Sequence, residues 1–399
     1  MYSQFNAAFN DSSDAKEAQD ILRRCVHCGF CNATCPTYQL KGDELDGPRG
    51  RIYLIKQIFE TDVVTEQTQR HLDRCLSCRS CETTCPSGVE FGRLADIGRH
   101  LTDQKVPRSW RQRLFRRVLM WWLPYPKRFK RLIQLARVLR PILPVQLKNK
   151  IPLSQHDNQW PKSRYTRKVL LLDGCVQQTL APKINASTAR VLEQLGISAI
   201  RLPNAGCCGA MNYHLSNQSG GLDKMRRIID ACWPSVESGV EAIIMTASGC
   251  GAMMKDYGKL LNDDPAYANK AERISALCKD ISEALSSEDL SKLTITPSKI
   301  AFQSPCSLQH AQGLNGVTET LLTKLGFTLT PVHDAHLCCG SAGTYSLLQP
   351  EIAGQLRSRK LDNLKQGQPE FIATANIGCL LHLQEKSNIS VIHWIELLA

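Results

Sequence analysis

The chain has 399 residues, of which 43% are hydrophobic, with 49 Lys and Arg against 37 Asp and Glu, and 18 cysteines. This length suggests several domains, and this apolar content supports buried cores, which excludes a disordered or fibrous protein and a disulfide-stapled miniprotein. The first 20 residues show no secretory signal, and no apolar run reaches the ~18 residues of a membrane span. We therefore expect a reducing, cytoplasmic compartment, in which 18 thiols indicate metal binding.

The net charge of +12 is concentrated in one segment. No acidic residue lies between Asp103 and Asp157, whereas 14 basic residues do, and subtracting 14 from +12 leaves −2 for the rest of the chain. These are Lys105, Arg108, Arg111, Arg113, Arg116, Arg117, Lys127, Arg128, Lys130, Arg131, Arg137, Arg140, Lys148 and Lys150. Because no nucleic-acid-binding module accompanies this charge, we expect no nucleic-acid partner.

Residues 1–105 carry eight cysteines in two runs of identical spacing. The pattern C-x2-C-x2-C-x3-C-P extends from Cys25 to Pro36 and again from Cys75 to Pro86. In this pattern three thiolates wrap one cubane cluster, and the fourth cysteine ligates the other cluster. The expected ligands are Cys25, Cys28, Cys31 and Cys85 for one [4Fe–4S] cluster, and Cys75, Cys78, Cys81 and Cys35 for the second. A zinc site or buried thiols are the alternative, which two identical runs disfavour.

Between the two runs, apolar residues recur at helical spacing in Gly50–Glu60. Ile52, Ile55, Ile58 and Phe59 form this stripe and are expected in the core. The long linker and the two cysteine runs resemble the α-helical ferredoxin domain that accompanies flavoproteins in respiratory dehydrogenases. The resemblance implies electron transfer between two nearby clusters.

Residues 106–165 form a proline-broken basic segment in which Arg and Lys alternate with large apolar residues. Arg111–Leu123 contains two tryptophans, and Lys127–Leu139 has a stripe that begins at Phe129. This composition is typical of amphipathic helices that lie on membranes, and anionic lipid attracts such basic residues. Docking to an acidic partner subunit and a plain solvated surface are the alternatives.

Residues 166–295 and 296–399 look like two copies of one unit. In each copy, 32 residues separate a single cysteine from a Cys-Cys-Gly triplet, and a Gly-Cys pair follows. The candidate metal ligands are Cys175, Cys207, Cys208 and Cys250 in the first copy, and Cys306, Cys338, Cys339 and Cys379 in the second. Repeats of this kind indicate one supersecondary unit used twice.

Each copy is expected to alternate strands with helices. The predicted strands are Val169–Asp173, Ile197–Leu202 and Glu241–Thr246 in the first copy, and Lys299–Gln303, Phe327–Val332 and Phe371–Ala375 in the second. The predicted helices are Ala189–Leu195 and Thr320–Leu325. Continuous apolar strands between helices favour a parallel sheet covered on both faces. The cysteines follow the strands, so they are expected to converge at the carboxyl edge of each sheet.

The duplicated cysteine pattern resembles the cysteine-rich CCG domain of heterodisulfide reductases and of glycolate oxidase, lactate-utilisation and anaerobic glycerol-3-phosphate dehydrogenase subunits. The segments Ala247–Met253, His336–Tyr345, Thr374–Cys379 and Val391–Glu396 are most similar to the glycolate oxidase iron–sulfur subunits. The resemblance implies a multidomain α+β and α/β fold: a helical ferredoxin domain, a helical linker and two α/β units.

It also implies an electron-transfer subunit on the inner face of the cell membrane. Glycolate would be oxidised to glyoxylate on a partner FAD subunit, beside a related second flavoprotein subunit, and electrons would pass toward quinone. D-lactate and glycerol-3-phosphate dehydrogenase subunits, a thiol–disulfide enzyme and an assembly scaffold are the rival functions.

One departure from the CCG pattern concerns the last cysteine motif. The fullest family pattern has C-x2-C there, but Ala247 and Asn376 occupy the earlier position. This departure argues against the non-cubane cluster of heterodisulfide reductases and against the thiol–disulfide enzyme. A third cluster, a zinc ion or a structural thiol set stay open. Cys232 and Cys278 stand alone in helical-looking stretches and are expected to be buried.

Histidines and aspartates near the cysteines are further candidates with structural alternatives. His27, His214, His310, His333 and His336 lie near cysteines, and His310 or His336 would be able to complete a metal site or carry protons. Asp173 and Asp334 precede cysteines and are expected to form turns. Neither G-x-G-x-x-G nor a P-loop is present, so we expect FAD on the partner and not on this chain.

Overall fold

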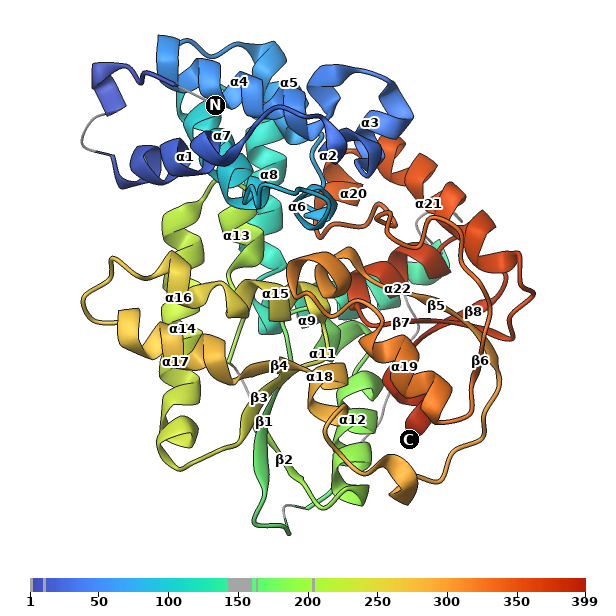
Figure 1. The fold of residues 1–399 in the computed structure, drawn as a ribbon. Coiled ribbons are helices and arrows are strands. Elements are labelled where there is room, and N and C mark those ends of the chain that lie inside the picture. The colour runs from blue at the N-terminus through green and yellow to red at the C-terminus, as the bar shows by residue number, and fades with distance from the viewer. Residues whose placement is uncertain (1–2, 10–11, 143–159, 163, 203–204) are drawn as a thin grey trace.

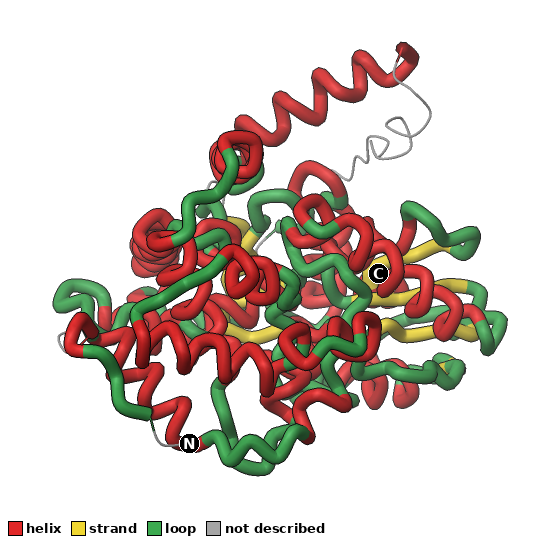
Figure 2. Tube along the Cα trace, turned by 90° about the horizontal axis from the view of Figure 1, so that it is seen from above, coloured by secondary structure: helices red, strands yellow, loops and turns green. Residues whose placement is uncertain are grey.

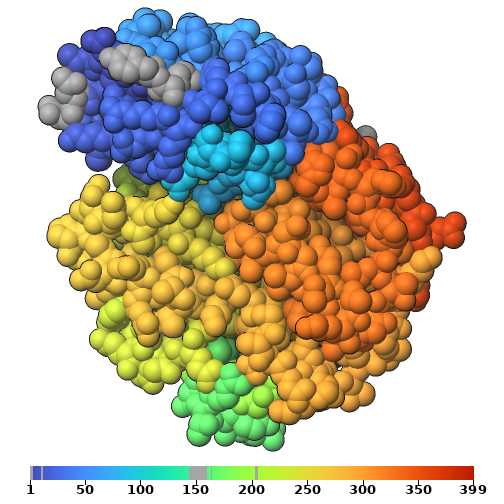
Figure 3. All heavy atoms as spheres, viewed as in Figure 1, coloured from blue at the N-terminus to red at the C-terminus, as the bar shows by residue number. Residues whose placement is uncertain are grey.

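The structure is a computed structural model that describes residues 3–9, 12–142, 160–162, 164–202 and 205–399. Lys148 and Lys150 of the basic segment lie outside the described residues. Figure 1 shows a helical N-terminal region above two α/β units, and Figure 3 shows that this region lies across both of them. The predicted fold class is confirmed.

The N-terminal region is helical. It contains η1 (Ala7–Phe9), α1 (Ser13–Arg24), α2 (Phe30–Ala33), α3 (Pro36–Lys41), η2 (Glu44–Asp46), α4 (Pro48–Thr61), α5 (Glu66–Asp73), α6 (Ser80–Thr83) and α7 (Phe91–Lys105). Pro48 opens α4, where proline is tolerated, and Asp62 in the left-handed conformation ends it. The predicted stripe of α4 is at most 3% exposed and packs against α1 and α7, so the predicted core is confirmed.

The basic segment forms two helices, α8 (Trp110–Trp122) and α9 (Pro126–Leu139), followed by η3 (Arg140–Ile142). Ion pairs from Arg108 and Arg116 to Asp73 connect α8 and its preceding loop to the N-terminal region. Only Phe129 of α9 is fully buried, and Figure 2 shows this helix projecting from the body of the molecule. Within the predicted apolar stripe of α9, Ile133 and Ala136 are half-buried, whereas Leu132 and Leu139 are exposed.

The first α/β unit has a four-stranded parallel sheet in the order β2-β1-β3-β4. Its strands are β1 (Lys168–Leu172), β2 (Ser198–Leu202), β3 (Ala242–Met245) and β4 (Cys278–Asp280). Its helices are α11 (Gln177–Leu180), α12 (Lys183–Gln194), α13 (Ala210–His214), α14 (Gln218–Glu237), α15 (Ser248–Lys255), α16 (Tyr257–Leu260), α17 (Ala268–Leu277), α18 (Ile281–Leu285) and η4 (Leu290–Lys292). Leu170 of the central strand β1 pairs with Ile200 on one side and Ile243 on the other.

The second unit repeats this topology in the order β6-β5-β7-β8. Its strands are β5 (Lys299–Gln303), β6 (Thr328–Leu329), β7 (Phe371–Thr374) and β8 (Ser390–His393). Its helices are η5 (Ser307–Ala311), α19 (Val317–Lys324), α20 (Tyr345–Leu348), α21 (Pro350–Lys365), α22 (Ile377–Gln384) and η6 (Trp394–Leu398). One continuous core joins the two units, and η6 packs on α12.

Three details differ from the sequence-based predictions. The strands β4 and β8 were not predicted, because each is a short edge strand that contains charged or polar residues. Cys278 begins β4 and does not lie within a helix, although it is buried as expected, and Cys232 is buried in α14. The strand predicted at Phe327–Val332 is reduced to two residues.

Candidate iron–sulfur and thiol sites

The two N-terminal cysteine runs adopt the same loop conformation. His27 and Gly29 in the first run, and Ser77 and Arg79 in the second, have φ between +51° and +84°. These left-handed residues flank the second cysteine of each run and turn the chain around it. In both loops the backbone N–H two residues after the first cysteine hydrogen-bonds its sulfur, at 3.4 Å in the second run. Each loop therefore gathers three thiols on one side.

The short helices that follow the two loops, α2 and α6, pack against each other. The hydroxyl of Thr84 donates to that of Thr34 at 3.3 Å, and Thr34 lies 3.4 Å from the carbonyl oxygen of Ser80. Because Thr34 and Thr84 occupy equivalent positions, the two runs face each other about an approximate two-fold axis. This packing directs the fourth cysteine of each run toward the other run.

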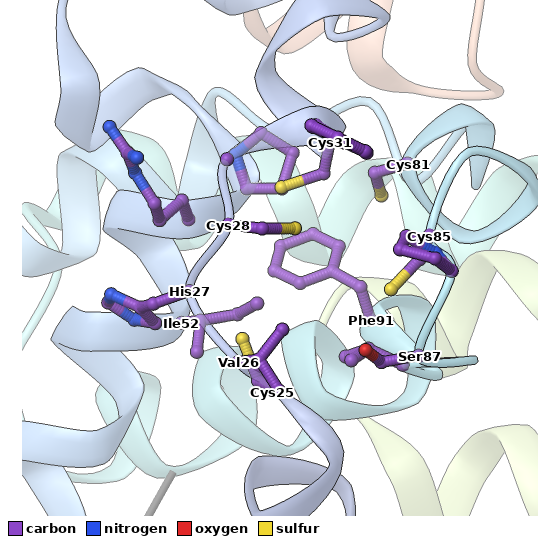
Figure 4. Close-up of a pocket in the computed structure, with 16 residues that line it drawn as sticks. Cys25, Val26, His27, Cys28, Cys31, Ile52, Cys81, Cys85, Ser87 and Phe91 are labelled. Atoms are coloured by element: carbon purple, nitrogen blue, oxygen red, sulfur yellow. The ribbon is translucent and has the colours of Figure 1, made fainter.

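The first site is a pocket beside the first run. Figure 4 shows the side chains of Cys25, Cys28, Cys31 and Cys85 around it, together with Cys81. Burial and the thiol of Cys25 raise the pKa of Cys31 to about 11. Cys28 is exposed, so this site lies at the molecular surface.

The second site gathers the remaining thiols and is deeply buried. Burial raises the pKa of Cys81 well above its usual value, and the nearby thiols of Cys78, Cys75 and Cys35 raise it further. Cys81 therefore lines the first pocket but has its thiol neighbours in the second set. Four clustered cysteines are the donor set of a soft metal or cluster, which displaces the thiol protons when it binds.

A charged network that sequence reasoning missed surrounds Cys35. Arg51, Asp46 and His71 are each at most 2% exposed, and Asp46 accepts hydrogen bonds from His71 at 2.9 Å and Arg74 at 2.6 Å. Asp43 also approaches within 4.8 Å of Asp46 and His71. Since two guanidinium groups already neutralise Asp46, this cluster does not resemble a cation site.

The geometry of the CCG triplets explains why each ends in glycine. Gly209 and Gly340 have φ of +89° and +92°. A Cβ atom on either would lie 2.7 Å from a backbone oxygen, that of Gly221 in the first unit and of Ala353 in the second. Glycine is therefore required for two reasons, the left-handed backbone and the close approach of helix α14 in the first unit or α21 in the second.

The thiols of the first unit converge as expected from the sheet topology. Cys207 hydrogen-bonds Cys175 and Cys208, and Cys208 hydrogen-bonds Cys250. The hydrogen bonds that Cys207 receives from its two neighbours lower its pKa well below the usual value. The hydroxyl of Tyr257 donates to the carbonyl oxygen of Cys208 at 2.8 Å and closes the set on one side.

The thiols of the second unit also converge, and they lie against the N-terminal region. The Sγ atoms of Cys306 and Cys338 are 3.6 Å apart, and those of Cys339 and Cys379 are 3.3 Å apart. Burial raises the pKa of Cys78 well above its usual value, and of the surrounding thiols Cys306 adds most to this rise. Cys78 and Cys306 also pack against the same apolar cluster. The second thiol set is therefore a direct neighbour of the second N-terminal site.

Ala247 and Asn376, which stand where the fullest CCG pattern has the first cysteine of its last C-x2-C motif, each lie immediately before a helix. Ala247 precedes α15, and Asn376 precedes α22 with its side chain accepting from Gly378 N at 3.3 Å. Asn376 is thus a helix cap. Ser248 and Ser307 hydroxyls meet at 2.8 Å between the units.

The candidate histidines have structural contacts. His27 lines the first pocket, and burial, followed by nearby Arg49, lowers its pKa. His310 uses both ring nitrogens, with Thr83 Oγ1 and the carbonyl oxygen of His336, each at 2.9 Å. His310 therefore joins the second unit to the N-terminal region and has no nitrogen left for a metal.

Among the other candidates, the side chains of His214, Asp173 and Asp334 make structural contacts. His214 pairs with Asp96 at 3.0 Å, across the contact between the N-terminal region and the first unit. Burial lowers the pKa of His336, while the backbone oxygen of His333 accepts from Asn363. The turn-forming aspartates each accept from an arginine, Asp173 from Arg201 and Asp334 from Arg359.

Two opposed cysteine loops in a helical domain, followed by two parallel-sheet units with converging thiols, define an iron–sulfur protein of the electron-transfer class. Comparison with family models agrees with this class. Residues 21–89 match a 4Fe-4S dicluster domain, and residues 169–255 and 300–384 match a cysteine-rich domain. The protein thus carries [4Fe–4S] clusters in its N-terminal region.

Comparison with characterised proteins narrows the class. The chain is 54% identical over its whole length to the glycolate oxidase iron–sulfur subunit of Escherichia coli, covering 98% of that protein. It is 29% identical to the probable glycolate oxidase iron–sulfur subunit of Bacillus subtilis, over 96% of this chain and 91% of that one. Lactate utilization protein A of an Exiguobacterium strain is 28% identical over only 58% of this chain. The chain belongs to the family of glycolate oxidase iron–sulfur subunits.

Proposed function

We propose that this protein is the electron-transfer subunit of a glycolate dehydrogenase complex. In this complex a partner FAD subunit, beside a related flavoprotein subunit, oxidises glycolate to glyoxylate, and this chain passes the electrons toward quinone. The observation that carries the proposal is the pair of opposed cysteine loops in a chain 54% identical to a glycolate oxidase iron–sulfur subunit over its whole length. The clusters supply one-electron carriers, and the residues of this chain bind, insulate and position them.

The proposed ligand sets are those that the spacing of the cysteines predicts. Cys25, Cys28, Cys31 and Cys85 would hold the first cluster, and Cys75, Cys78, Cys81 and Cys35 the second. The convergence of the first four around one pocket supports this assignment, as does the proximity of Cys35, Cys75 and Cys78 to Cys81, which adds to the rise in its pKa that burial causes. Four thiols at each site fit the donor set of a cubane cluster. The regions 1–105, 106–165, 166–295 and 296–399 are proposed as the corresponding structural divisions.

The two thiol sets of the α/β units are proposed as further soft-metal sites, for an iron–sulfur cluster or zinc. Convergence of four buried or half-buried cysteines in each unit supports this. The second set is the better placed of the two to exchange electrons with the N-terminal region, because Cys306 neighbours Cys78.

Electrons are proposed to enter at the first site. Val26 and Phe30 flank the exposed Cys28 and are 67% and 61% exposed. Large apolar side chains exposed around a redox site are typical of a docking surface. The partner flavoprotein is proposed to cover this surface.

Membrane contact is proposed for α8 and α9. Trp110 and Trp121 on α8 are more than half exposed, and on α9 Leu135 and Val138 are 56% and 74% exposed. Basic residues lie beside these apolar residues, and neither helix contains an acidic residue, so the charge of α8 and α9 complements the anionic lipids of an inner membrane face. Among the described residues, no helix has the length and hydropathy needed to cross a bilayer.

The decisive experiment is anaerobic purification of this chain with its partners, followed by iron, sulfide and flavin counts and a substrate screen. We expect about eight iron atoms per chain from two clusters, and about twelve if a third cluster is present. Glycolate, but neither D-lactate nor glycerol 3-phosphate, should reduce the clusters of the complex. Normal glycolate-dependent quinone reduction in a strain lacking this chain would refute the proposal, and preferential reduction by D-lactate would assign the rival substrate.

A further inference from the structure

Two arginines near the start of α4 lie toward different cysteine sites. Arg49 lines the pocket of the first site, whereas Nη1 of Arg51 lies 4.0 Å from Cys35 Sγ, in the proposed second site. Residues two apart on a helix point in nearly opposite directions. One helix terminus thus supplies a guanidinium group to each site, and the surroundings of the two groups differ.

The charge of the arginine at the first site is balanced and exposed to solvent. Nε of Arg49 donates to Oε1 of Glu44 at 2.6 Å, and the side chains are 37% and 41% exposed. Solvent and salt screen such a pair. Arg49 therefore adds little net charge to the field at the first site.

The arginine at the second site is buried and held in place by hydrogen bonds. Arg51 is 1% exposed, and its Nε donates to the carbonyl oxygen of His71 at 2.8 Å. Its Nη1 and Nη2 both donate to Thr37 Oγ1 at 3.1 Å, and this hydroxyl lies 3.3 Å from Cys35 Sγ. The guanidinium group is thus positioned against the sulfur atom.

The charge of this buried network is positive. Asp46 is the carboxylate nearest to Arg51, at 3.6 Å, but it lies closer to Arg74, at 2.6 Å. Two guanidinium groups thus share one buried carboxylate, so the three side chains together carry one net positive charge. The carboxylate of Asp43 lies within 4.8 Å of Asp46 but is exposed, so solvent screens its charge. Within a buried site, where the effective dielectric constant is lower than in water, this charge acts strongly on nearby groups.

We propose that Arg51 raises the reduction potential of the second site above that of the first. Reduction adds negative charge to a thiolate-bound cluster, and a fixed cation beside a ligand sulfur stabilises the reduced form. Arg51 is a positioning residue in this role, because it acts through Cys35. The electron that a reduced flavin gives to the first site then moves downhill to the second. This inference rests on the proposed ligand sets.

The test is a redox titration of the full-length, anaerobically purified chain, followed by electron paramagnetic resonance. The Cys28→Ser variant identifies the signal of the first site. In the wild type the other signal should appear at the higher potential. Arg51→Gln should lower the reduced-to-oxidised ratio of the second site at least tenfold at a fixed potential, which is about 59 mV for one electron. Arg51→Lys should retain most of the wild-type potential, and the matched control Arg49→Gln should leave both signals in place.

The Asp46→Asn variant supplies a test of opposite sign. It removes the negative charge of the network, so the second site should become easier to reduce. If the Arg51→Gln protein does not retain its iron, the reduction potential of the second site in Asp46→Asn tests the inference instead. Three results would overturn the inference: reduction of the first site before the second in the wild type, equal shifts of both sites in Arg51→Gln, or no upward shift in Asp46→Asn. If Cys28→Ser alters neither signal, the proposed ligand sets are wrong instead.

Discussion

The apolar side chains on the outer face of α9 provide a direct test of membrane contact. Leu135, Val138, Leu139 and Ile142 follow helical spacing and are 56%, 74%, 39% and 79% exposed. Val138 follows the buried Phe129 by nine residues and so lies on the opposite side of the helix, with Leu135 beside it. Substituting the outer residues therefore changes the surface and leaves the core intact.

The double variant Leu135→Ser/Val138→Ser should weaken binding to vesicles. Full burial of such a side chain is worth about 1.5–3 kcal/mol, and these two are 56% and 74% exposed, so together they contribute about 2–4 kcal/mol. The vesicle partition coefficient should fall roughly 30- to 900-fold. Thermal stability should stay within about 0.5 kcal/mol of the wild type, because both positions are on the surface.

The assay is co-flotation of the full-length protein with vesicles that contain anionic lipid, compared with vesicles of zwitterionic lipid alone. Each basic residue near the surface adds about 1 kcal/mol on anionic lipid, so the wild type should prefer the anionic vesicles strongly. Val63→Ser/Leu347→Ser is the matched control, since these residues are 64% and 48% exposed elsewhere on the molecule. Equal flotation of the α9 variant and the wild type would refute the reasoning. Loss of the flavoprotein partner without loss of flotation would assign α9 to subunit docking.

Three further predictions concern the cluster sites, a close approach of the backbone and a buried histidine. Cys85→Ser should lower the iron content from about eight to about four atoms and remove the signal of the first site, whereas Cys35→Ser should remove the signal of the second site. Loss of the second signal in Cys85→Ser and of the first signal in Cys35→Ser would exclude crossed ligation. Gly50→Ala should lower the free energy of unfolding by about 1–3 kcal/mol, because the added Cβ atom would lie 2.1 Å from a backbone oxygen of η2. The control Gly354→Ala should instead stabilise the protein, because the added Cβ atom has no neighbour within 4 Å and alanine favours the helix. Burial lowers the pKa of His393 from 6.5 to about 4. Between pH 6.5 and pH 4 the unfolded chain therefore binds more protons at this residue than the folded protein does. The free energy of unfolding should fall by about 2 kcal/mol from pH 7 to pH 5. A His393→Gln variant with the same pH slope as the wild type would contradict this last prediction.

Local spacing was sufficient to predict the elements whose chemistry is repeated in the chain. The two cysteine runs predict two similar loops, and the structure shows left-handed residues at equivalent positions in both. The CCG triplets predict sites at the ends of parallel strands, where the thiols do converge. In each case one short segment carries both the ligands and the glycine or proline that shapes the backbone.

Contacts between distant segments were not predictable in the same way. No spacing links Arg51 to Cys35, Asp46 and Arg74, because three different helices and a loop bring them together. A buried arginine resembles a solvated one in the sequence, since only its surroundings in the fold differ. The exposed Leu135 and Val138 of α9 were also missed, because they lie outside the apolar stripe that begins at Phe129.

The two α/β units have the same topology but different neighbours. In the first unit, the contact with the N-terminal region is made by charged and polar side chains, including the ion pair of Arg79 with Asp256 at 2.5 Å and the pair of His214 with Asp96. In the second unit, Cys306 and Cys338 contact an apolar cluster that also contains Leu76 and Cys78. A polar contact positions a domain, whereas close approach of two thiol sites provides a short path for electrons. On the proposed assignment of the thiol sites, the second unit is therefore the better placed of the two to exchange electrons with the second site.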